Sequence, residues 1–549
     1  MPVVDYQPST PVFLREVTSR FAASDLIVYE GNRLSYRELA SASAELARGM
    51  LARGIGKATR LGLLMPNSDQ FLIAWFAAAR IGAIIIPINT FYKPRELGYV
   101  LQHADVQVLL TVSALLNNNY LERLQSCVPA LHAHVAADGP LFDALYPWLR
   151  EVYVWPSQAH AAALPAWALP ATALHQAPGR VSAEQLAASE GCVSPADLLC
   201  IVYSSGSTAD PKGALHSHGA VIRHAANLNR WRDIVAGDRL FSPMPFFWVG
   251  GLVFTLHCAM HAGASLIYEE VFEPGETLKL IERERATLVT GWPHYGTAMA
   301  DHPTFAARDL SCIRGGNIYA LLPPDVKPED PELRSNALGM TETCGPHSIE
   351  RMDVDLPEAL RGSFGRAPEG ITHKIVEPDT GAPLPAGQVG EICVRGYNVM
   401  QGLYKVEREE CFDAEGFYHT GDAGYLNTEG YLFFQARLGD MIKTGGANVT
   451  PREVEIVIDE QPEVQASYVV GLPHPERGQE VAAAVVLNAG AALDAQTLRA
   501  RLKAELSTYK VPTQLFFYAK GEIPFTDSGK VDKRRLGELL AAQRSAGER

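Results

Sequence analysis

A stretch of hydroxyl-bearing residues and glycine follows a strongly apolar run near the middle of the chain. Residues 199–203 (LCIVY) lead directly into Ser204, Ser205, Gly206, Ser207 and Thr208, and Lys212 follows closely. Hydroxyl groups donate hydrogen bonds, glycine lets backbone amides turn inward around an anion, and lysine adds a positive charge. These residue types at this spacing predict an anion-binding loop that suits a phosphate group.

The same residues also fit an ordinary solvated turn between a strand and a helix. The loop is not a Walker A motif, because the spacing GxxxxGK[ST] occurs nowhere in the chain. No GxGxxG follows an expected strand either, so a dinucleotide-binding fold is unsupported. Taken alone, the loop leaves both interpretations open.

Further residues that could take part in catalysis or binding lie downstream in four short motifs. These are LGMTE at 338–342, YHTGD at 418–422, ARLGDMIKTGGANVTPREVE at 436–455 and PFTDSGKVDKR at 524–534. Each has a simple structural alternative, such as a surface carboxylate for Glu342, a turn residue for Asp422 or a solvated lysine for Lys530. No single motif decides between these interpretations.

Together and in this order, the loop and the four motifs closely resemble those of the adenylate-forming superfamily. That superfamily comprises acyl-CoA synthetases, luciferases and peptide-synthetase adenylation domains. The resemblance covers the whole chain, including an N-terminal third that is also similar to the family. It implies that a substrate carboxylate attacks the α-phosphorus of ATP, which gives an acyl-adenylate and pyrophosphate.

The resemblance implies a role for each group around ATP. Glu342 is expected to bind Mg²⁺, since a hard carboxylate suits an ion that bridges phosphates, and Thr341 is expected near the α-phosphate. The β- and γ-phosphates are assigned to Ser204, Ser205, Gly206, Ser207, Thr208 and Lys212. The adenine and ribose are assigned to Gly315, Gly316, Asn317, Leu338, Gly339, Met340, Asp422 and Arg437.

The C-terminal motifs imply the remaining catalytic groups. Lys530 is expected to contact the α-phosphate and the attacking carboxylate, where a fixed cation offsets developing negative charge. Gly445 and Gly446 are expected to let the pantetheine of coenzyme A (CoA) pass close to the backbone, with Lys443 beside them. The simpler interpretation of the glycine pair is a β-turn.

Four positions depart from the family pattern. Ala209 replaces a glycine after Thr208, and Leu338 stands where an aromatic ring normally stacks on adenine. Gly439 lies where the family's hinge often has Asp or Lys, and Trp248 occupies the position of a histidine in many members. Trp248 is expected either to be a core aromatic or to gate the acyl pocket.

The segment around Trp248 predicts an apolar substrate. Aromatic and small residues there would line an open apolar cleft for a fatty or bulky cyclic carboxylic acid. They are Phe246, Phe247, Trp248, Val249, Gly250 and Gly251. The resemblance, together with this apolar segment, implies an ATP-dependent acyl-CoA synthetase of fatty acid metabolism. The alternatives are an acyl-AMP ligase that loads a carrier protein, a luciferase-type oxygenase, and a non-catalytic binding protein of the same fold.

The elements that must position these groups follow from hydrophobic periodicity. Helical spacing predicts helices over 34–56, 70–82 and 94–104, and continuous apolar runs predict strands over 60–67, 83–89 and 106–112. Alternating strands and helices indicate an α/β fold with parallel sheets covered on both faces. The Ala- and Pro-rich stretch from 152 to 188 predicts an irregular connection or a surface excursion.

The pattern of predicted strands and helices changes toward the C-terminus. Turn-rich residues within 372–396 and 430–439 predict hairpins, and 449–462, 464–473, 480–487 and 494–506 predict helix, strand, strand and helix. We therefore expect an N-terminal AMP-binding domain over 1–436, a hinge over 437–440 and a small C-terminal domain over 441–549. The resemblance implies a distorted β-barrel in the first domain and mobility in the second, which has an α+β fold.

Composition excludes several classes of protein. The chain has 549 residues, 47% of them hydrophobic and 20% charged, with a net charge of -14. These values are near those of soluble globular proteins, so a disordered chain or a coiled-coil rod is disfavoured. An acidic chain is also a poor nucleic-acid binder, although net charge does not exclude a local anion site. The resemblance to the adenylate-forming superfamily implies ATP, Mg²⁺ and CoA as cofactors.

Targeting signals and metal motifs are not evident in the sequence. The first residues lack the pattern of a signal peptide, and the longest apolar stretch, 71–88, is interrupted by Arg80 and Gly82. The cysteines are scattered at positions 127, 192, 200, 258, 312, 344, 393 and 411, with no CxxC pair. This pattern predicts reduced thiols in a cytoplasmic protein and suggests neither a disulfide framework nor a zinc site. A homodimer stays open.

Overall fold

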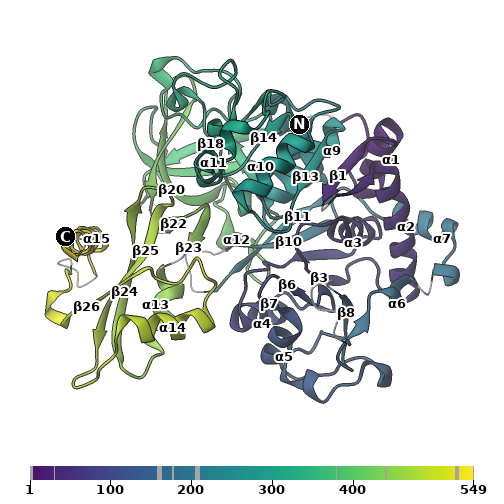
Figure 1. Ribbon diagram of the computed structural model, residues 1–549, viewed down its shortest axis with the longest axis horizontal. Helices are drawn as coiled ribbons and strands as arrows, with labels where there is room; N and C mark the ends of the chain where they lie inside the picture. The colour runs from purple at the N-terminus through teal and green to yellow at the C-terminus, as the bar shows by residue number, and fades with distance from the viewer. Residues whose placement is uncertain are drawn as a thin grey trace. The chain divides into compact units, whose positions relative to one another are not determined.

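The structure is a computed structural model, shown as a ribbon in Figure 1. It describes residues 4–29, 31–156, 163–175, 178–204, 210–378, 380–438, 442–449, 451–525 and 531–547. The predicted site residues Ser205, Gly206, Ser207, Thr208 and Lys530 lie outside the described residues, as do Ala209 and Gly439. Arg437 is described by its backbone only.

The chain forms two compact units. The larger comprises Met1–Thr90, Val100–Tyr203 and Gly213–Ala436, and the smaller comprises Phe91–Tyr99, Ser204–Lys212 and Arg437–Arg549. The predicted α/β class with parallel sheets is confirmed. The predicted domain limits and the hinge at 437–440 stay predictions.

One of the two large sheets has seven strands, and the pairs that it forms are largely parallel. Its central strands have apolar residues at successive positions, such as Leu63 and Leu64, and both are buried because helices cover the two faces. In sheet order the strands are β11 (Lys212–Ser217), β10 (Leu198–Ser204), β4 (Ile84–Pro87), β3 (Arg60–Leu64), β5 (Val108–Val112), β8 (Glu151–Trp155) and β9 (Leu169–Pro170).

A second sheet of six strands has the same character. Its pairs are parallel except for β2, which returns antiparallel to β1. In sheet order the strands are β15 (Gly315–Gly316), β14 (Leu288–Val289), β12 (Arg239–Phe241), β13 (Ser265–Tyr268), β1 (Asp25–Tyr29) and β2 (Asn32–Ser35).

Local signals begin and end the helices. Ser35 and Glu38 form a capping box at the start of α2, and Ser68 caps α3. The helices of residues 1–436 are α1 (Thr10–Phe21), α2 (Tyr36–Ala52), α3 (Asp69–Arg80), α4 (Pro94–His103), α5 (Tyr120–Cys127), α6 (Thr172–His175), α7 (Ala183–Gly191), α8 (His218–Arg232), α9 (Cys258–Ala262), α10 (Pro274–Arg283), α11 (Pro293–Ala300) and α12 (Arg408–Cys411). A π-helix, η4 (Gly250–His257), precedes α9.

The stretch 152–188 is more ordered than predicted. It contains most of β8, the short strand β9, α6 and the start of α7. Helix α6 is held by close backbone contact, because a Cβ atom on Gly49 of α2 would lie 1.6 Å from the carbonyl oxygen of Leu174. The prediction of an irregular connection is wrong here because buried tertiary contacts outweigh the weak local propensity of Ala and Pro.

Antiparallel structure follows the two parallel sheets. Strands β18 (Ile371–Val376), β19 (Gly390–Gly396), β20 (Tyr418–Leu426) and β21 (Leu432–Arg437) form a four-stranded sheet in chain order. This is the sheet found in the region where the resemblance implies a distorted barrel. Two short hairpins are β6 (Ala114–Leu115) with β7 (Asn118–Asn119), and β16 (Leu338–Met340) with β17 (Gly345–Ser348).

The described residues of 437–549, in the smaller unit, form a five-stranded sheet and three α-helices. Val454, Ile458, Leu498 and Leu502 lie at helical spacing and pack against the sheet in one buried cluster. The strands are β22 (Ile442–Thr444), β23 (Ala447–Val449), β24 (Val464–His474), β25 (Gly478–Leu487) and β26 (Gln514–Phe517), and the helices are α13 (Pro451–Asp459), α14 (Ala495–Glu505) and α15 (Lys533–Gly547). In the described part of the chain no helix is long and apolar enough to cross a bilayer.

Candidate active site

Thr341 and Glu342 open a single 3-10 turn, η8 (Thr341–Thr343), which connects β16 to β17. The chain leaves the turn through Cys344, whose φ of 58° is left-handed, and Gly345 continues with a φ of 111°. The Glu342 side chain is largely buried, with a residue exposure of 9%. A tight turn of this kind presents consecutive side chains at the end of a hairpin.

Three donors from two other segments hold the carbonyl groups of this turn. Nε2 of His216 lies 2.8 Å from the carbonyl oxygen of Thr341. The backbone amide of Met400 donates to the carbonyl of Glu342 at 2.8 Å, and Nδ2 of Asn398 donates to that of Thr343 at 2.8 Å. Because every carbonyl in the turn has a donor, the backbone beneath Thr341 and Glu342 is fixed.

His216 holds its position as a neutral ring. Burial lowers its pKa to about 4, while the hydrogen bond to Thr341 acts in the opposite direction. Since a carbonyl oxygen only accepts, the proton of the neutral ring resides on Nε2. His216 is therefore a fixed donor to the turn at neutral pH.

The hairpin before the turn leaves no room for larger side chains. A Cβ atom on Gly339 would lie 2.5 Å from the carbonyl oxygen of Gly345, so β16 and β17 approach closely only because residue 339 is glycine. Leu338 is 6% exposed and packs in the apolar cluster beside the four-stranded sheet. Met340 is half-buried at the end of β16.

Asp422 lies in an irregular part of β20. In the pairing of β19 with β20, Glu391 lies opposite Ala423 and Cys393 lies opposite His419. Two residues along β19 therefore span four residues along β20, which forms a bulge. Gly421 takes a φ of 70° in this bulge, and the Thr420 hydroxyl accepts from the Asp422 amide at 3.1 Å. Bulges commonly redirect side chains beside functional sites, and Asp422 is almost fully buried at 3% exposure.

The predicted adenine segment is built by close backbone packing. A Cβ atom on Gly316 would lie 1.9 Å from the carbonyl oxygen of Val289, whereas one on Gly315 would meet only a leucine methyl at 3.5 Å. The Asn317 amide bridges the backbone of Gly291, since it donates to its carbonyl and accepts from its amide, both at 2.9 Å. Asn317 therefore ties this segment to the loop after β14.

The described ends of the predicted phosphate loop lie on adjacent strands. Ser204 ends β10 and Lys212 begins β11, and these two strands are neighbours in the seven-stranded sheet. Both residues are half-buried. Gly213 follows in a tight space, because a Cβ atom there would lie 2.7 Å from the Ile201 side chain.

The segment predicted to bind the acid is an aromatic cluster. The rings of Phe247 and Trp248 lie 5.1 Å apart, and those of Trp248 and Trp292 lie 5.9 Å apart at 80°. Trp292 in turn stacks on Tyr295 at 5.9 Å. Trp248 and Trp292 are half-buried, whereas Phe246, Phe247 and Val249 are buried. Trp248 is thus part of a row of aromatic rings in which Phe247 is buried and the two tryptophans are partly exposed.

The glycine pair after Trp248 starts the π-helix η4. A Cβ atom on Gly251 would lie 2.0 Å from the carbonyl oxygen of Pro245, but one on Gly250 would meet only the sulfur of Met244 at 3.4 Å. Asn67 fixes the preceding turn, since it donates to the carbonyl of Met244 at 2.8 Å and accepts from the amide of Phe246 at 2.7 Å. π-Helical turns are frequent at functional sites.

Within the smaller unit, the predicted CoA segment is a tight hairpin. Gly445 and Gly446 form the two-residue turn between β22 and β23, with φ values of 55° and 80°. Two consecutive positive φ angles favour glycine at both positions. Lys443 is exposed on β22, and its backbone amide donates to the Gln479 side chain at 2.8 Å.

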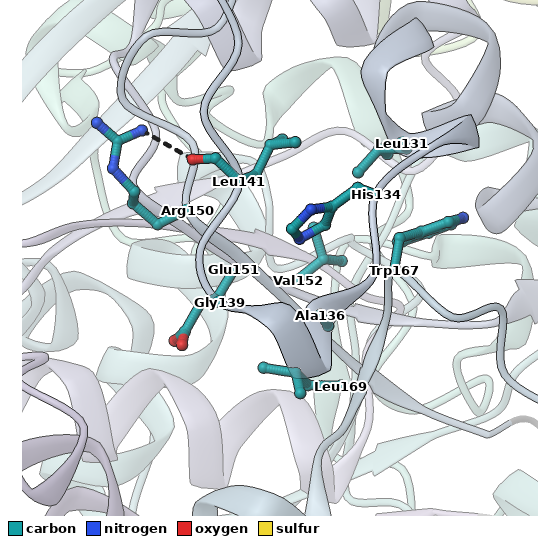
Figure 2. A pocket seen from close by; sticks show the side chains of 10 residues that line it. All are labelled: Leu131, His134, Ala136, Gly139, Leu141, Arg150, Glu151, Val152, Trp167 and Leu169. Atoms are coloured by element: carbon teal, nitrogen blue, oxygen red, sulfur yellow. Dashed lines mark hydrogen bonds between the residues drawn. The ribbon is translucent and has the colours of Figure 1, made fainter.

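A small cavity in the larger unit has none of these residues in its lining (Figure 2). It is lined by Leu131, His134, Ala136, Gly139, Leu141, Arg150, Glu151, Val152, Trp167 and Leu169. Arg150 donates to the carbonyl of Leu141 at 3.2 Å, as the dashed line in Figure 2 shows. Its volume of about 10 Å³ suits roughly one water molecule, so it is too small for a substrate.

Comparison with protein families decides the family of the chain. Residues 14–404 match the model of the AMP-binding enzyme family, and residues 453–530 match that of the AMP-binding enzyme C-terminal domain. The chain belongs to the AMP-binding enzyme family. The resemblance to the adenylate-forming superfamily that the motifs predicted is therefore confirmed, and the protein is an adenylate-forming ligase by family.

Curated relatives of this AMP-binding enzyme are acyl-CoA synthetases and ligases. The protein named "Putative acyl-CoA synthetase YngI" of Bacillus subtilis (strain 168) is 30% identical over 537 residues, with 96% of each chain covered. The mitochondrial medium-chain acyl-CoA ligase ACSF2 of Rattus norvegicus is 29% identical and covers 94% of this chain and 84% of its own. The structure of o-succinylbenzoate CoA synthetase (MenE) from Bacillus subtilis shares the fold, with a TM-score of 0.74, 22% identity and coverage of 96% and 98%.

Several residues that build the site were not predicted. His216, Asn398 and Asn67 act on backbone groups of other segments, and Trp292 extends the aromatic row. Their partners lie far away in sequence, and no local spacing identifies such pairs. A weak signal for His216 was its place on an apolar strand, where a buried imidazole needs a hydrogen-bond partner.

Proposed function

We propose that this AMP-binding enzyme is an ATP-dependent acid–thiol ligase that activates an apolar carboxylic acid as an acyl-adenylate. It then transfers the acyl group to CoA, so that the products are acyl-CoA, AMP and pyrophosphate. The observation that carries the proposal is the fixed turn of Thr341 and Glu342, whose three carbonyls are each held by a donor. Relatives named as acyl-CoA synthetases and ligases support the choice of CoA as the acceptor.

In the proposed first step, a carboxylate oxygen of the acid attacks the α-phosphorus of ATP and pyrophosphate leaves. Transfer of this kind depends on positioning and charge neutralisation. The hydrogen bonds of the turn fix the backbone from which the Thr341 hydroxyl and the Glu342 carboxylate project. We assign to Lys530 the role of offsetting the negative charge that develops on the α-phosphate and the attacking carboxylate.

The residues of the turn also fit a magnesium ion. Mg²⁺ prefers oxygen ligands and is often held by one or two carboxylates together with the phosphates of its substrate. Glu342 supplies a hard carboxylate from the fixed turn, and Thr341 adds a neutral hydroxyl beside it. The ion, when bound, supplies positive charge that offsets the phosphates of ATP.

The ribose and the second step involve other groups. The buried carboxylate of Asp422 in the bulge suits a bidentate contact with both ribose hydroxyls.

In the second step the CoA thiol attacks the acyl carbonyl and AMP leaves. We assign the pantetheine to the turn of Gly445 and Gly446, whose backbone carries no side chain, with Lys443 nearby. We assign the movement of the C-terminal domain between the two steps to a hinge at 437–440.

The aromatic row favours an acid with a long or bulky apolar group. Trp248 and Trp292 are half-buried, so their ring faces suit a hydrocarbon chain that enters the core.

The absence of CxxC pairs and the free cysteines fit an enzyme of a reducing cytoplasm. We therefore place the reaction in fatty acid metabolism.

ATP–pyrophosphate exchange with a panel of acids, with and without CoA, tests the proposal. The panel contains medium and long linear acids and a steroid side-chain acid. We expect exchange that depends on the acid, and CoA thioester as the product. Exchange without any thioester would instead support a ligase that loads a carrier protein, and no exchange with any acid would support a binding protein.

Substitution of Lys530 separates the two steps. Lys530→Ala should abolish exchange while largely preserving thioester formation from supplied acyl-adenylate, because the lysine is assigned to the first step only. Lys520→Ala, in the described η10 turn (Lys520–Glu522), is a matched control on the surface. Normal exchange in the Lys530 variant would refute the assignment.

A further inference from the structure

Three potential metal ligands of different chemistry lie on one face of the four-stranded sheet. Glu391 and Cys393 are two residues apart on β19, so their side chains point to the same face. His419 on β20 is the direct register partner of Cys393. Antiparallel pairing therefore brings a carboxylate, a thiol and an imidazole together although His419 is distant in sequence.

The three ligand atoms are close enough to share one ion. Nδ1 of His419 lies 2.8 Å from Oε2 of Glu391 and 3.5 Å from the sulfur of Cys393. One ligand atom from each residue lies within 4.8 Å of the others, and no other group with this property occurs in the part of the chain that the structure describes. Ligands bound to one tetrahedral ion at about 2.0–2.3 Å lie about 3.3–3.8 Å apart, so the 3.5 Å separation fits an ion, and the 2.8 Å separation, which is a hydrogen bond here, must widen by about half an ångström.

Neighbouring groups already orient two of the ligands. Oε1 of Glu391 accepts from the backbone amide of Gly421 at 3.0 Å, which leaves Oε2 facing His419. On the other side of the imidazole, Nε2 lies 3.7 Å from Oδ2 of Asp413. A metal-bound histidine characteristically directs its second nitrogen at a carboxylate, and Nδ1 ligation would create that arrangement here.

The charges around the cluster tolerate a cation. Glu391, Asp413 and Glu415 supply three carboxylates, and Lys374 and Arg395 supply two cationic groups. Lys374 pairs with Asp413 at 2.8 Å and with Glu415, so it already offsets part of their charge, whereas Arg395 donates to the backbone carbonyl of Glu415 and packs over the Phe417 ring. The carboxylate oxygen that faces His419 is not used by either of them.

We propose that Glu391, Cys393 and His419 bind a divalent transition-metal ion of the zinc class. The mixture of sulfur, nitrogen and oxygen ligands suits Zn²⁺, whereas Mg²⁺ and Ca²⁺ prefer oxygen alone. The three residues leave a fourth position open on the side of His419, whose side chain is 37% exposed. This site is separate from the magnesium assigned to Glu342.

Binding requires the thiol to lose a proton to solvent, because the thiolate is the ligand. Burial raises the pKa of Cys393 to about 12 in the absence of an ion. Metal affinity should therefore fall as the pH falls, since protons compete with the ion for the sulfur. The bound ion would also tie Glu391 to the bulge that contains Asp422.

Cobalt substitution tests the proposal without any measurement of activity. The full chain with Cys192→Ser, which removes an exposed thiol, is stripped of metal and titrated with Co²⁺. We expect one ion per chain, a thiolate-to-cobalt charge-transfer band in the near ultraviolet, and displacement of Co²⁺ by an equivalent of Zn²⁺. Absence of that band would overturn the proposal.

Variants assign the ligands. Cys393→Ser should lose the charge-transfer band, and His419→Gln, at a more exposed position, should weaken Co²⁺ binding at least tenfold even if Cys393→Ser does not fold. Cys411→Ser, a buried cysteine outside the cluster, and Glu415→Gln should bind like the parent chain. A band that persists in Cys393→Ser, or unchanged affinity in His419→Gln, would place the metal elsewhere.

Discussion

The carbonyl oxygen of Thr341 depends on a residue outside the family motifs. His216→Ala removes one of its two donors, at 2.8 Å, and leaves the Cys344 amide at 3.0 Å as the other, so we expect a cost of about 0.5–1.5 kcal/mol in the free energy of unfolding. Because the turn positions Thr341 and Glu342, we also expect kcat for ATP–pyrophosphate exchange to fall by roughly ten- to a hundredfold, as small displacements at a reacting centre do. Steady-state kinetics and thermal unfolding measure the two effects.

A matched variant distinguishes positioning from general damage. His218→Ala removes an equally buried histidine two residues away, whose Nδ1 lies 2.7 Å from the Thr10 hydroxyl. It should lose similar stability but retain kcat at temperatures where it is folded. Equal losses of kcat in the two variants would show that His216 acts through stability alone.

Trp248 offers a second test at the level of a single residue. Trp248→Ala removes a ring that contacts both Phe247 and Trp292, so it should alter the KM for the acid while the KM for ATP stays nearly constant. Loss of apolar contact predicts a rise of roughly tenfold or more for the preferred acid. Trp148→Ala, at an exposed aromatic elsewhere, is the control. An unchanged acid profile would remove the proposed gate.

At the scale of elements, the start of the π-helix η4 depends on one glycine rather than two. Gly251→Ala places a methyl group 2.0 Å from the Pro245 carbonyl oxygen, and the backbone must move. Overpacking of this kind costs about 1–3 kcal/mol, so a lower melting temperature is expected. Gly250→Ala meets only the end of a flexible methionine at 3.4 Å and should be nearly neutral. Similar melting temperatures for both variants would contradict the predicted packing.

The elements that the sequence predicted best have strong periodicity and clear ends. The expected helix over 70–82 is α3 (Asp69–Arg80), and the expected strand over 464–473 is β24 (Val464–His474). The elements missed within 152–188 are short, and tertiary contacts such as that between Gly49 and Leu174 stabilise them. Periodicity reports the side chains of one segment, so it cannot report contacts between segments.

The same limit applies to the sites. Thr341, Glu342 and Asp422 belong to local motifs, which made them predictable, but Asn67, His216 and Asn398 act on distant backbone groups. The sequence suggested no zinc site, because Cys393 and His419 meet only through the register of β19 and β20. The bulge in β20 shifts that register and cannot be identified from residue types alone.

At the scale of the whole molecule, buried histidines are a shared property of the larger unit. His216, His218, His224, His257 and His347 are each at most 1% exposed. Burial lowers the pKa of His224 to about 3 and that of His216, His218 and His257 to about 4, and it holds that of His347 well below its usual value. The folded protein therefore keeps these rings neutral where an unfolded chain would protonate them.

This difference makes stability depend on pH with a definite sign. Below the unfolded pKa of about 6.5 the unfolded chain binds more protons than the folded one, so the free energy of unfolding decreases as the pH falls toward 4. Each such histidine removes about 2 kcal/mol by pH 5, and several together approach the typical domain stability of about 5–15 kcal/mol. We expect a steep fall in melting temperature between pH 7 and 5, well above the range where carboxylates titrate. His224→Phe, which removes one titrating ring that packs beside Tyr397, should reduce that slope, and a melting temperature constant over this range would show that the rings are not held neutral.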